Sequence, residues 1–468
     1  MPATDSPAII VARFLKSSNY TETYDAFIAE AGLPSDAGAV SKGDLTIEQL
    51  LEEKKTFDLS RDFEKLGLES EDDGKGWLKP VFEAPEHAQR VSSLPSSSNI
   101  LSVAVHTMQF ADGEMPALFA TSADRRLHIL DASTMALQAS LAGLQDSPML
   151  SCVVFRRKHL LTAAMSGQLL VSNMDGSTVE SRRDHTKYIV RVAVRDDAIE
   201  PLIATAGWDG KIMIYRPSVT TSGEMSLGDP KVTITVPTKP EAMIFIEHPD
   251  AQQLILLVTR TDSSFLYYYT TESEPRLLGR QNLAPHSNAW VAFTPSALAL
   301  SPRDPTLVAV GTSTVPHMKL LLVRLLIPSY DQQTQPTSQP DRTSPHSDPP
   351  IVPDTQSSQA RRELALADRE SAAIQIHCTT MAPQTAYSTP AVAWRPDGSG
   401  VWVNGDDGAV RGVEVSSGKV VCTLLGGHEA GSKVRCLWAG RVGDGEVLVS
   451  GGFDQRLVVW RAGVVDVS

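Results

Sequence analysis

Cysteine is scarce in this sequence and is placed so that it cannot build a disulfide framework. The chain has 468 residues and four cysteines, and no two of them form a Cys-x-x-Cys pair. The cysteines are Cys152, Cys378, Cys422 and Cys436, mostly inside apolar runs. Thiols in such runs behave as small buried hydrophobes, which is typical of a protein from a reducing compartment.

Positive charge is also in short supply. Lys and Arg number 42 against 55 Asp and Glu, which gives a formal net charge of −13, and no dense basic run occurs. Binding to nucleic acid depends on clustered Lys and Arg side chains. We therefore expect no nucleic-acid partner.

Long apolar runs are absent as well. The longest, Leu320 to Ile327, is interrupted by Arg324 and is far shorter than the roughly 20 residues needed to span a bilayer. The first residues, Met-Pro-Ala-Thr-Asp-Ser-Pro, have neither the basic start nor the apolar core of a secretory signal. We expect an intracellular protein, cytoplasmic or nuclear or both, that is not secreted and has no membrane partner.

The sequence also lacks the short motifs that mark common active sites. It has no phosphate-binding Gly-x-x-x-x-Gly-Lys-Ser/Thr, no Gly-x-Ser-x-Gly turn and no zinc-binding His-Glu-x-x-His. We expect no catalytic residue, no cofactor, no metal ligand and no enzymatic activity. The alternative is an enzyme whose active site lies in the central channel of the fold.

What the sequence does contain, from about residue 88 onward, is a series of short strands. Apolar residues alternate with a period of two, and the runs recur about every forty residues. The first runs of successive groups begin at Ile100, Leu150, Ile189, Ala242, Ser296, Ala391 and Val434. Such groups predict a mainly β fold, a seven-bladed β-propeller over residues 88–468. The middle groups are divergent, so six or eight blades remain alternatives.

Two features complete the predicted propeller. The last group lacks a fourth strand after Trp460, and Val91 to Leu94 can supply it and close the ring without a free edge. At about 329–360 the composition turns to Gln, Ser, Thr, Pro and Asp, which predicts a disordered insertion between the third and fourth strands of blade five. Arg361 to Glu370 then predict one or two turns of helix.

The last group carries four polar residues that can form a buried hydrogen-bond chain. His428 precedes its first strand, and Ser450, Asp454 and Trp460 follow at regular spacing. Bonds from Trp to Ser, Ser to His and His to Asp would tie the loop ahead of the blade to the turn inside it. The third group carries a second set, with Tyr in place of Trp: His185, Thr205, Asp209 and Tyr215.

This pattern resembles the WD repeat, and the resemblance implies that the two polar sets are structural. Ser, His and Asp also make up the nucleophile triad of hydrolases, so a catalytic interpretation is the alternative. Recurrence of the set within one chain favours the structural role, because a catalytic triad occurs once.

A helical hairpin is expected ahead of the propeller, within residues 5–40. Apolar residues at positions 10, 11, 14 and 15 share one helical face, and those at 20, 24, 27 and 28 share a face of a second helix. Asn19 lies at the break, where it can adopt a positive φ, and Gly32 with Pro34 ends the second helix. So small a hairpin leaves an apolar face bare, which a second copy usually covers.

The hairpin resembles the LisH motif on the following residues: Phe14, Leu15, Asn19, Tyr20, Thr23, Phe27 and Glu30. Members of that family mostly dimerise through this hairpin, so the resemblance implies a homodimer. The contact residues would be Phe14, Leu15, Tyr20, Tyr24 and Phe27. A hairpin docked on its own propeller is the alternative. Residues 41–87 would hold a short helix that opens at Thr46 and an acidic linker, Glu69 to Gly76.

The resemblance to WD propellers also indicates a binding face. The residue before the turn Asp and the residue before the first strand point to one face of such rings. Trp208 and Phe453 precede the turn Asp, and Tyr188 and Lys433 precede the first strand. Large exposed aromatic side chains suit a protein-binding hot spot, and Trp208 with Tyr188 is the preferred anchor. Alternatively, Trp208 packs on its own turn.

These features predict a non-catalytic scaffold or adaptor that dimerises through the hairpin and holds a protein partner within a multisubunit complex. The alternative is a subunit or substrate receptor of a ubiquitin ligase. Receptors of the cullin-adaptor kind usually show Trp-Asp-x-Arg at a strand end. The matching positions read Leu130-Asp131-Ala-Ser133 and Trp460-Arg461-Ala-Gly463, which disfavours that class.

Overall fold

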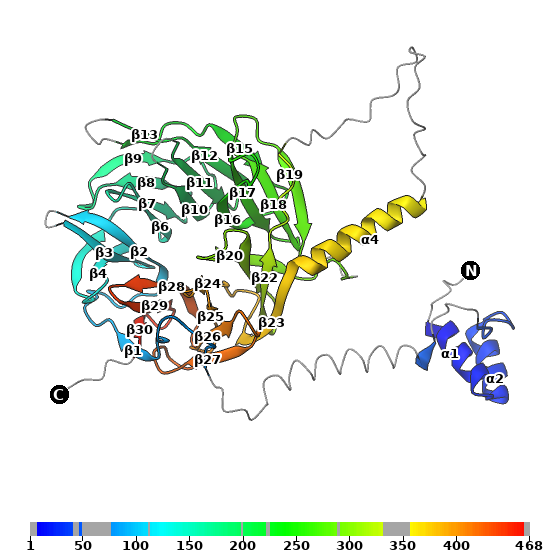
Figure 1. Ribbon diagram of the computed structural model, residues 1–468. Coiled ribbons are helices and arrows are strands. Elements are labelled where there is room, and N and C mark those ends of the chain that lie inside the picture. The colour runs from blue at the N-terminus through cyan, green and yellow to red at the C-terminus, as the bar shows by residue number, and fades with distance from the viewer. Residues whose placement is uncertain are drawn as a thin grey trace, which may run out of the picture. The chain divides into compact units, whose positions relative to one another are not determined.

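The structure is a computed structural model that describes residues 7–40, 46–48, 76–110, 113–197, 200–220, 225–287, 291–330 and 356–462. The chain divides into two units, Met1–Gly74 and Lys75–Ser468. The first contains a helical hairpin and the second a ring of β-sheets (Figure 1). None of the described helices has the length and apolar character that crossing a membrane requires.

The larger unit is a mainly β, seven-bladed propeller, so the alternatives of six or eight blades are wrong. In the described residues, seven antiparallel four-stranded sheets form the ring. Blades one to three are β2 (Ile100–Phe110), β3 (Gly113–Ser122), β4 (Arg126–Asp131) and β5 (Leu137–Ala142); β6 (Met149–Phe155), β7 (His159–Ala164), β8 (Leu169–Ser172) and β9 (Thr178–Arg182); and β10 (Ile189–Arg195), β11 (Leu202–Gly207), β12 (Lys211–Tyr215) and β15 (Val232–Thr235).

Blades four to six are β16 (Pro240–Glu247), β17 (Leu254–Arg260), β18 (Phe265–Thr270) and β19 (Leu277–Asn282); β20 (Thr294–Leu300), β21 (Leu307–Ser313), β22 (His317–Arg324) and β23 (Ile374–Pro383); and β24 (Val392–Trp394), β25 (Gly400–Asn404), β26 (Val410–Glu414) and β27 (Val420–Leu424). Blade seven is β28 (Val434–Val442), β29 (Gly445–Gly452), β30 (Leu457–Arg461) and β1 (His87–Arg90). A small hairpin of β13 (Ser218–Val219) and β14 (Met225–Ser226) follows β12.

The hydrophobic core is divided among the interfaces between blades. Each apolar cluster of the described residues joins two neighbouring sheets, and together the clusters cover all seven junctions of the ring. The second strands are buried on both faces, as in β7 and β11, because a blade packs against a neighbour on each side. The first strands β2, β6, β10, β16, β20, β24 and β28 neighbour one another around the centre (Figure 1).

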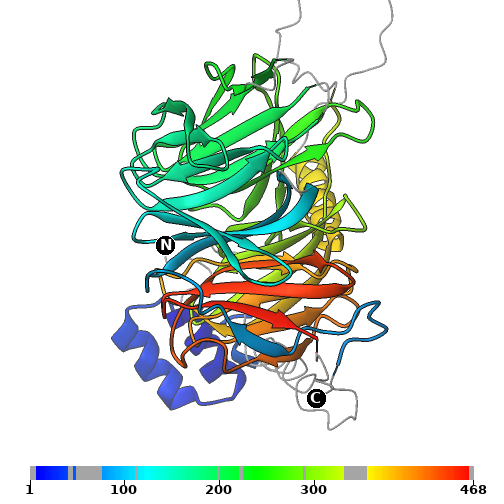
Figure 2. The ribbon, with the colours of Figure 1, turned by 90° about the vertical axis from the view of Figure 1, so that its left-hand side faces the viewer.

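The ring closes with a strand from the start of the propeller, as expected, but with a different strand. β1 pairs with β30 and spans His87–Arg90, whereas the sequence pointed to Val91 to Leu94. Figure 2 shows blue β1 beside the red strands from the end of the chain. All four residues of β1 are exposed. An outermost strand needs no apolar alternation, so hydropathy cannot locate it.

The chain just before β1 covers blades six and seven. The Trp77 ring packs edge-on against Trp402, with 5.2 Å between ring centroids, and the Arg395 guanidinium lies 4.5 Å from the Trp77 ring. Arg395 and Glu446 form an ion pair at 2.7 Å with both side chains fully buried. Arg395 also donates to the carbonyl of Phe82 at 2.9 Å. This buried pair therefore joins blade six, blade seven and the preceding segment.

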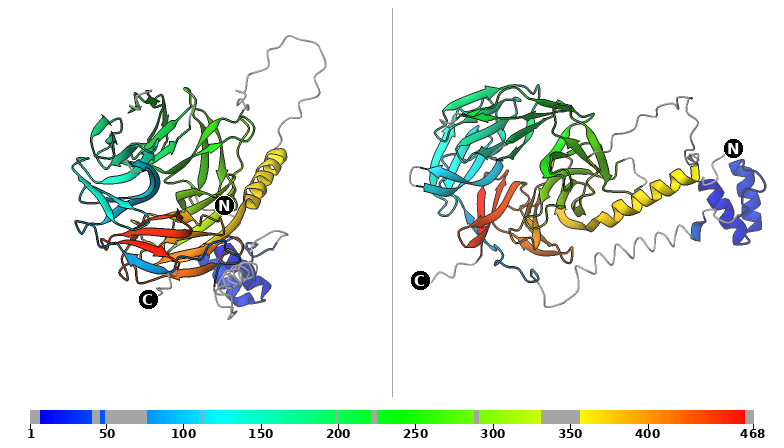
Figure 3. Two further views of the ribbon diagram at one scale, coloured as in Figure 1. Left: turned by 60° about the vertical axis from the view of Figure 1, so that its left-hand side comes forward. Right: turned by 45° about the horizontal axis from the view of Figure 1, so that its top comes forward.

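The insertion lies where the sequence placed it, between β22 and β23 of blade five. The disorder predicted for it falls on residues 331–355, outside the described residues. α4 (Gln356–Ala373) is longer than the predicted one or two turns and begins inside the range expected to be disordered. Figure 3 shows α4 extending from the edge of the ring. Its last turn is attached where Glu370 accepts a hydrogen bond from the backbone N–H of Asn282, at 2.7 Å.

The hairpin consists of α1 (Pro7–Ser17) and α2 (Thr21–Ala31). Asn19 has a φ of 58° and Gly32 a φ of 63°, so both adopt the left-handed conformation expected at the break and at the end of α2. Tyr24 is buried, and its hydroxyl donates to the carbonyl of Ser35 at 3.0 Å. The chain after α2 therefore folds back over this side chain. The helix expected to open at Thr46 and the acidic linker lie outside the described residues, apart from the ends of those ranges.

Candidate functional site

The polar set of blade seven forms a buried chain of hydrogen bonds. His428 Nδ1 lies 3.1 Å from both carboxylate oxygens of Asp454, and its Nε2 lies 2.8 Å from Ser450 Oγ. Trp460 Nε1 donates to Ser450 Oγ at 2.9 Å. An imidazole that donates through Nδ1 to the carboxylate accepts the Ser450 proton at Nε2, so every group has a partner. The set ties the loop ahead of β28 to the turn between β29 and β30.

The set of blade three repeats this geometry except at its fourth member. His185 Nδ1 lies 3.0 Å from Asp209 Oδ1, and His185 Nε2 lies 2.8 Å from Thr205 Oγ1. The hydroxyl of Tyr215, however, donates to Asp184 at 2.9 Å. A phenol reaches farther from the strand than an indole N–H does. Tyr215 therefore anchors the residue ahead of His185.

The Ser450, His428 and Asp454 constellation offers no access to a substrate. Ser450 is fully buried, and its oxygen already contacts both Trp460 and His428. Burial alone would raise the pKa of the Asp454 carboxyl, but hydrogen bonds from His428 and from the Glu429 N–H outweigh it and hold that pKa below its usual value. A carboxylate so placed orients an imidazole within a blade.

The predicted anchor pair, Trp208 and Tyr188, lies together on one face of the ring. The two rings stack with 5.2 Å between centroids and an interplanar angle of 22°. Trp208 also donates its backbone N–H to the Tyr188 carbonyl at 2.9 Å, and Lys239 Nζ lies 4.5 Å from its ring. Even so, 36% of Trp208 is exposed. The side chain thus packs locally and still presents a rigid aromatic face to solvent.

Phe453 and Lys433 take the equivalent places in blade seven but differ in availability. The Phe453 N–H bonds the Lys433 carbonyl at 2.9 Å, as Trp208 bonds Tyr188, and 41% of Phe453 is exposed. The Lys433 ammonium is paired with Asp406 at 2.9 Å and with Thr385 at 2.7 Å. Its charge is therefore used to join blades six and seven.

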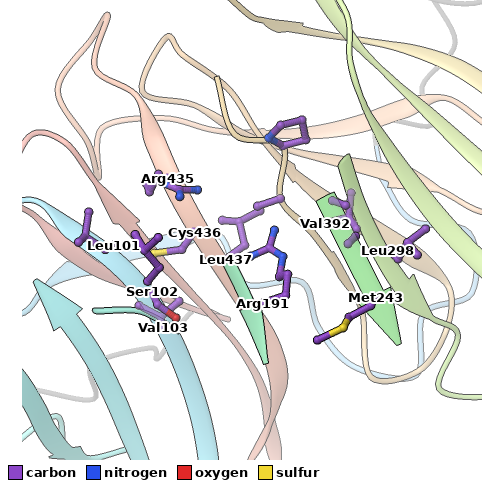
Figure 4. Close-up of a pocket in the computed structure, with 15 residues that line it drawn as sticks. Leu101, Ser102, Val103, Arg191, Met243, Leu298, Val392, Arg435, Cys436 and Leu437 are labelled. Atoms are coloured by element: carbon purple, nitrogen blue, oxygen red, sulfur yellow. The ribbon is translucent and has the colours of Figure 1, made fainter. Parts of the chain in front are cut away.

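A cavity of about 360 Å³ opens beside Trp208. It shares Leu150, Arg191, Pro390 and Arg435 with a second cavity of about 200 Å³, which lies among the first strands of the blades. The two cavities therefore adjoin, the larger at the mouth of the ring and the smaller in its central channel. Figure 4 shows the inner part, where Arg435, Cys436 and Leu437 of β28 lie across from Leu298 and Val392.

The side chains that line this space are placed by a repeated backbone irregularity. In six of the described sheets, the pairing of the first strand with the second shifts at the second residue of the first strand or next to it. Such a bulge leaves one residue unpaired and re-aims its side chain. The bulged residues are Leu101, Leu150, Val190, Glu241, Ser296 and Arg435, and each lines the channel or its mouth.

Two arginines and one glutamate provide the charge of this mouth. Burial, and then repulsion from Arg191, lower the pKa of Arg435 to about 10. Burial also lowers the pKa of Arg191, against the attraction of Glu241. Burial raises the pKa of Glu241, opposed by Arg191, Lys239 and Arg435. The mouth of an acidic protein thus carries an excess of positive charge.

The described residues contain no group of three or more His, Cys, Asp or Glu side chains that could hold a metal ion. None of the four cysteines forms a disulfide, and burial raises the pKa of Cys152 to about 12 and that of Cys436 to about 12. These thiols are therefore poor nucleophiles at neutral pH.

The sequence from the closing strand to the last strand matches a known family. The family described as UCP007778, beta-propeller domain, covers residues 85–461. The chain belongs to this family. A search of the curated proteins finds no match.

For this family member, sequence reasoning missed Arg191, Glu241 and Arg435, which line the channel mouth. A signal was available, because Glu241 and Arg435 occupy the strand position that holds Leu or Val in blades one to three. Placing the repeats in register on their first strands would have exposed these charged substitutions. The bulges that turn the side chains inward leave no mark in hydropathy.

Proposed function

We propose that this β-propeller protein is a non-catalytic interaction scaffold that holds a protein partner on the face carrying Trp208. The observation that carries the proposal is the stacked Trp208 and Tyr188 pair, a large aromatic surface held rigidly beside an open cavity. Rigid, partly exposed aromatic side chains at the rim of a pocket are typical hot spots, since little conformational entropy is lost on binding.

Two finer statements belong to the same proposal. The repeats are of the WD kind, supported by the hydrogen-bonded sets around His428 and His185. The hairpin is a LisH motif through which two copies associate, supported by the left-handed Asn19 and by the exposed Tyr20 ring. Two propellers in one assembly would bind a repeated partner more tightly through effective concentration.

The test is affinity capture with the full chain and its Trp208→Ala variant. Truncation should leave thermal unfolding almost unchanged and weaken capture at least tenfold, about 1.4 kcal/mol. Leu277→Ala is the matched control, because Leu277 is 48% exposed on the outer strand β19. A large loss of stability in Trp208→Ala with intact capture would make Trp208 a purely structural residue.

The same capture separates this scaffold from its rival. Ligase subunits that depend on Trp208 for recovery would assign the chain to a ubiquitin-ligase complex as a subunit or receptor. Recovery of other multisubunit assemblies with the same dependence would support the general scaffold.

A further inference from the structure

Arg191 and Arg435 line the channel mouth without a fixed partner. Among the described residues, neither guanidinium makes a hydrogen bond, and no carboxylate lies within ion-pair distance of either. Arg395 shows how this protein holds a structural arginine: it pairs with Glu446 at 2.7 Å and also bonds Ser399 and the Phe82 carbonyl. Arg191 and Arg435 have five donors each and use none of them within the described chain.

Holding these two cations together is unfavourable in the unliganded protein. They are partly enclosed, they repel each other, and Glu241 offsets only one of the two charges. Charges that are partly withdrawn from water without a partner destabilise a fold unless something else compensates. Functional sites are the usual places where such an arrangement persists.

The surrounding side chains suit an anion. Hydroxyls of Thr294, Ser313 and Thr389 line the same cavity and can donate hydrogen bonds. Glu241 is the one carboxylate among the lining residues. Asp406, which accepts a hydrogen bond from the lining residue Ser388, is engaged by Lys433 at 2.9 Å. The fork of a guanidinium matches the two oxygens of a carboxylate or a phosphate.

We propose that the channel mouth binds an anionic group of the protein partner, a carboxylate or a phosphate monoester, between Arg191 and Arg435. The inference rests on the proposed function, because Trp208 lines the same cavity and would contact the adjoining part of the partner. A cavity of about 360 Å³ at the mouth accepts a glutamate or phosphoserine side chain. The partner is therefore an acidic or phosphorylated segment that enters the ring.

The direct test uses small probes on the full chain. N-acetyl-glutamate amide and N-acetyl-phosphoserine amide should bind, as measured by calorimetry and by NMR line broadening, and neutral N-acetyl-glutamine amide should not. The arm that binds more tightly identifies the carboxylate or the phosphate as the source of the anion. Replacement of both arginines, R191Q with R435Q, should weaken binding at least tenfold.

Arg303→Gln is the control, since Arg303 is exposed in the turn after β20 and its replacement removes the same charge elsewhere. Equal binding of the anionic probes to wild type, R303Q and the double variant would overturn the inference as non-specific charge attraction. Failure of both acidic probes to bind the folded wild type would overturn it as well.

Partner capture separates this inference from the proposed function. Capture lost in both W208A and the double arginine variant supports the two together. Partner capture that is lost in W208A but unchanged in the double variant overturns the anion site, whereas the proposed partner-binding face around Trp208 is retained. Probe binding with unchanged capture in the double variant overturns the site as part of the partner interface.

Discussion

At the scale of single residues, Arg435 differs from the paired arginine Arg395 in the state of its charge. Its pKa is lowered to about 10, which means that the charged form is less favourable in the folded state than in the unfolded chain. The charge therefore costs stability in full at every pH below about 10, and the cost is lost progressively as the pH rises from that value to the higher pKa of arginine in the unfolded chain. Arg435→Gln should raise the free energy of unfolding by on the order of 1 kcal/mol at pH 7.

Chemical denaturation of the two proteins measures this difference. Arg303→Gln, on the exposed turn, should change stability by less than about 0.5 kcal/mol. A clear loss of stability in Arg435→Gln would show that the arginine supports the fold, and the pair with Arg191 would then need no ligand to account for it.

Asp454 makes the opposite prediction, because its pKa is depressed. Stability from such a carboxylate is fully present above the unfolded-state pKa near 4 and is lost as the pH falls through the lower folded-state value. Asp454→Asn should lower the free energy of unfolding by about 1–3 kcal/mol at pH 7, because His428 loses a charged acceptor. The difference in the free energy of unfolding between wild type and Asp454→Asn should become smaller below about pH 4.

Urea unfolding of both proteins at several pH values measures this difference in the free energy of unfolding. Asp250→Asn serves as the control, since Asp250 is exposed in the turn between β16 and β17. A difference in the free energy of unfolding that stays constant from pH 7 to pH 3 would mean that the amide introduced by Asp454→Asn disrupts packing and that the carboxylate charge contributes nothing.

The residues that sequence alone could identify are those that repeat or that match a known pattern. His428 and Trp208 belong to such patterns, and the structure places both beside the expected neighbours. Spacing predicts Tyr215 as the fourth member of its set, beside Thr205, but it does not predict that the hydroxyl also donates to Asp184, because spacing does not encode side-chain length. Arg191 and Arg435 lie in strands otherwise read as apolar, and hydropathy does not show that they line the channel, where Arg435 is itself the bulged residue and Arg191 follows the bulged Val190.

At the scale of elements, the segment before β1 makes a testable contact with blade six. A Cβ at Gly400 would come within 1.9 Å of the Trp77 ring, and the three nearest atoms all belong to Trp77. The absence of a side chain at Gly400 therefore leaves the space that the Trp77 ring occupies. Gly400→Ala should destabilise the protein by about 1–3 kcal/mol, because the ring must move off its contacts with Trp402 and Arg395.

A double-mutant cycle gives the measurement. In a Trp77→Ala background the added methyl meets no ring, so Gly400→Ala should then cost less than about 0.5 kcal/mol. Gly445→Ala is the control, since nothing lies within 4 Å of its Cβ position. Additive costs of the two substitutions would place the Trp77 ring elsewhere in solution.

Strands with an alternating apolar pattern were predictable from the sequence, whereas elements without an apolar pattern, such as β1 and α4, were not. The first strands of the seven groups begin within two residues of their predicted starts. The closing strand His87–Arg90 is exposed and is held by backbone pairing alone, so no side-chain pattern marks it. α4 has no apolar stripe, and Leu364 and Leu366 on it are 60% and 54% exposed. Its full length was invisible to periodicity for that reason.

At the scale of the whole molecule, the proposed dimer depends on the hairpin surface. Of the five predicted contact residues, Tyr24 is buried against its own chain, whereas Phe14, Leu15 and Phe27 are half-buried. Tyr20 is the most exposed of them, at 55%. A second copy would therefore be contacted through Tyr20 and its half-buried neighbours, with Tyr24 holding the hairpin in shape.

Tyr20→Asp should convert the full chain from twice the mass of one chain to a single chain in light scattering. Tyr20 is the N-cap of α2, and Asp is a favoured N-cap, so the substitution places a charge in the apolar surface without weakening the helix. Thr21→Asp adds the same charge one residue away, off the predicted apolar face, and should remain dimeric. A wild-type chain that stays single up to roughly 100 μM, well above the dissociation constants of ordinary specific dimers, would contradict the hairpin interface. Capture through Trp208 would still be expected in that case, but with the affinity of one propeller rather than two.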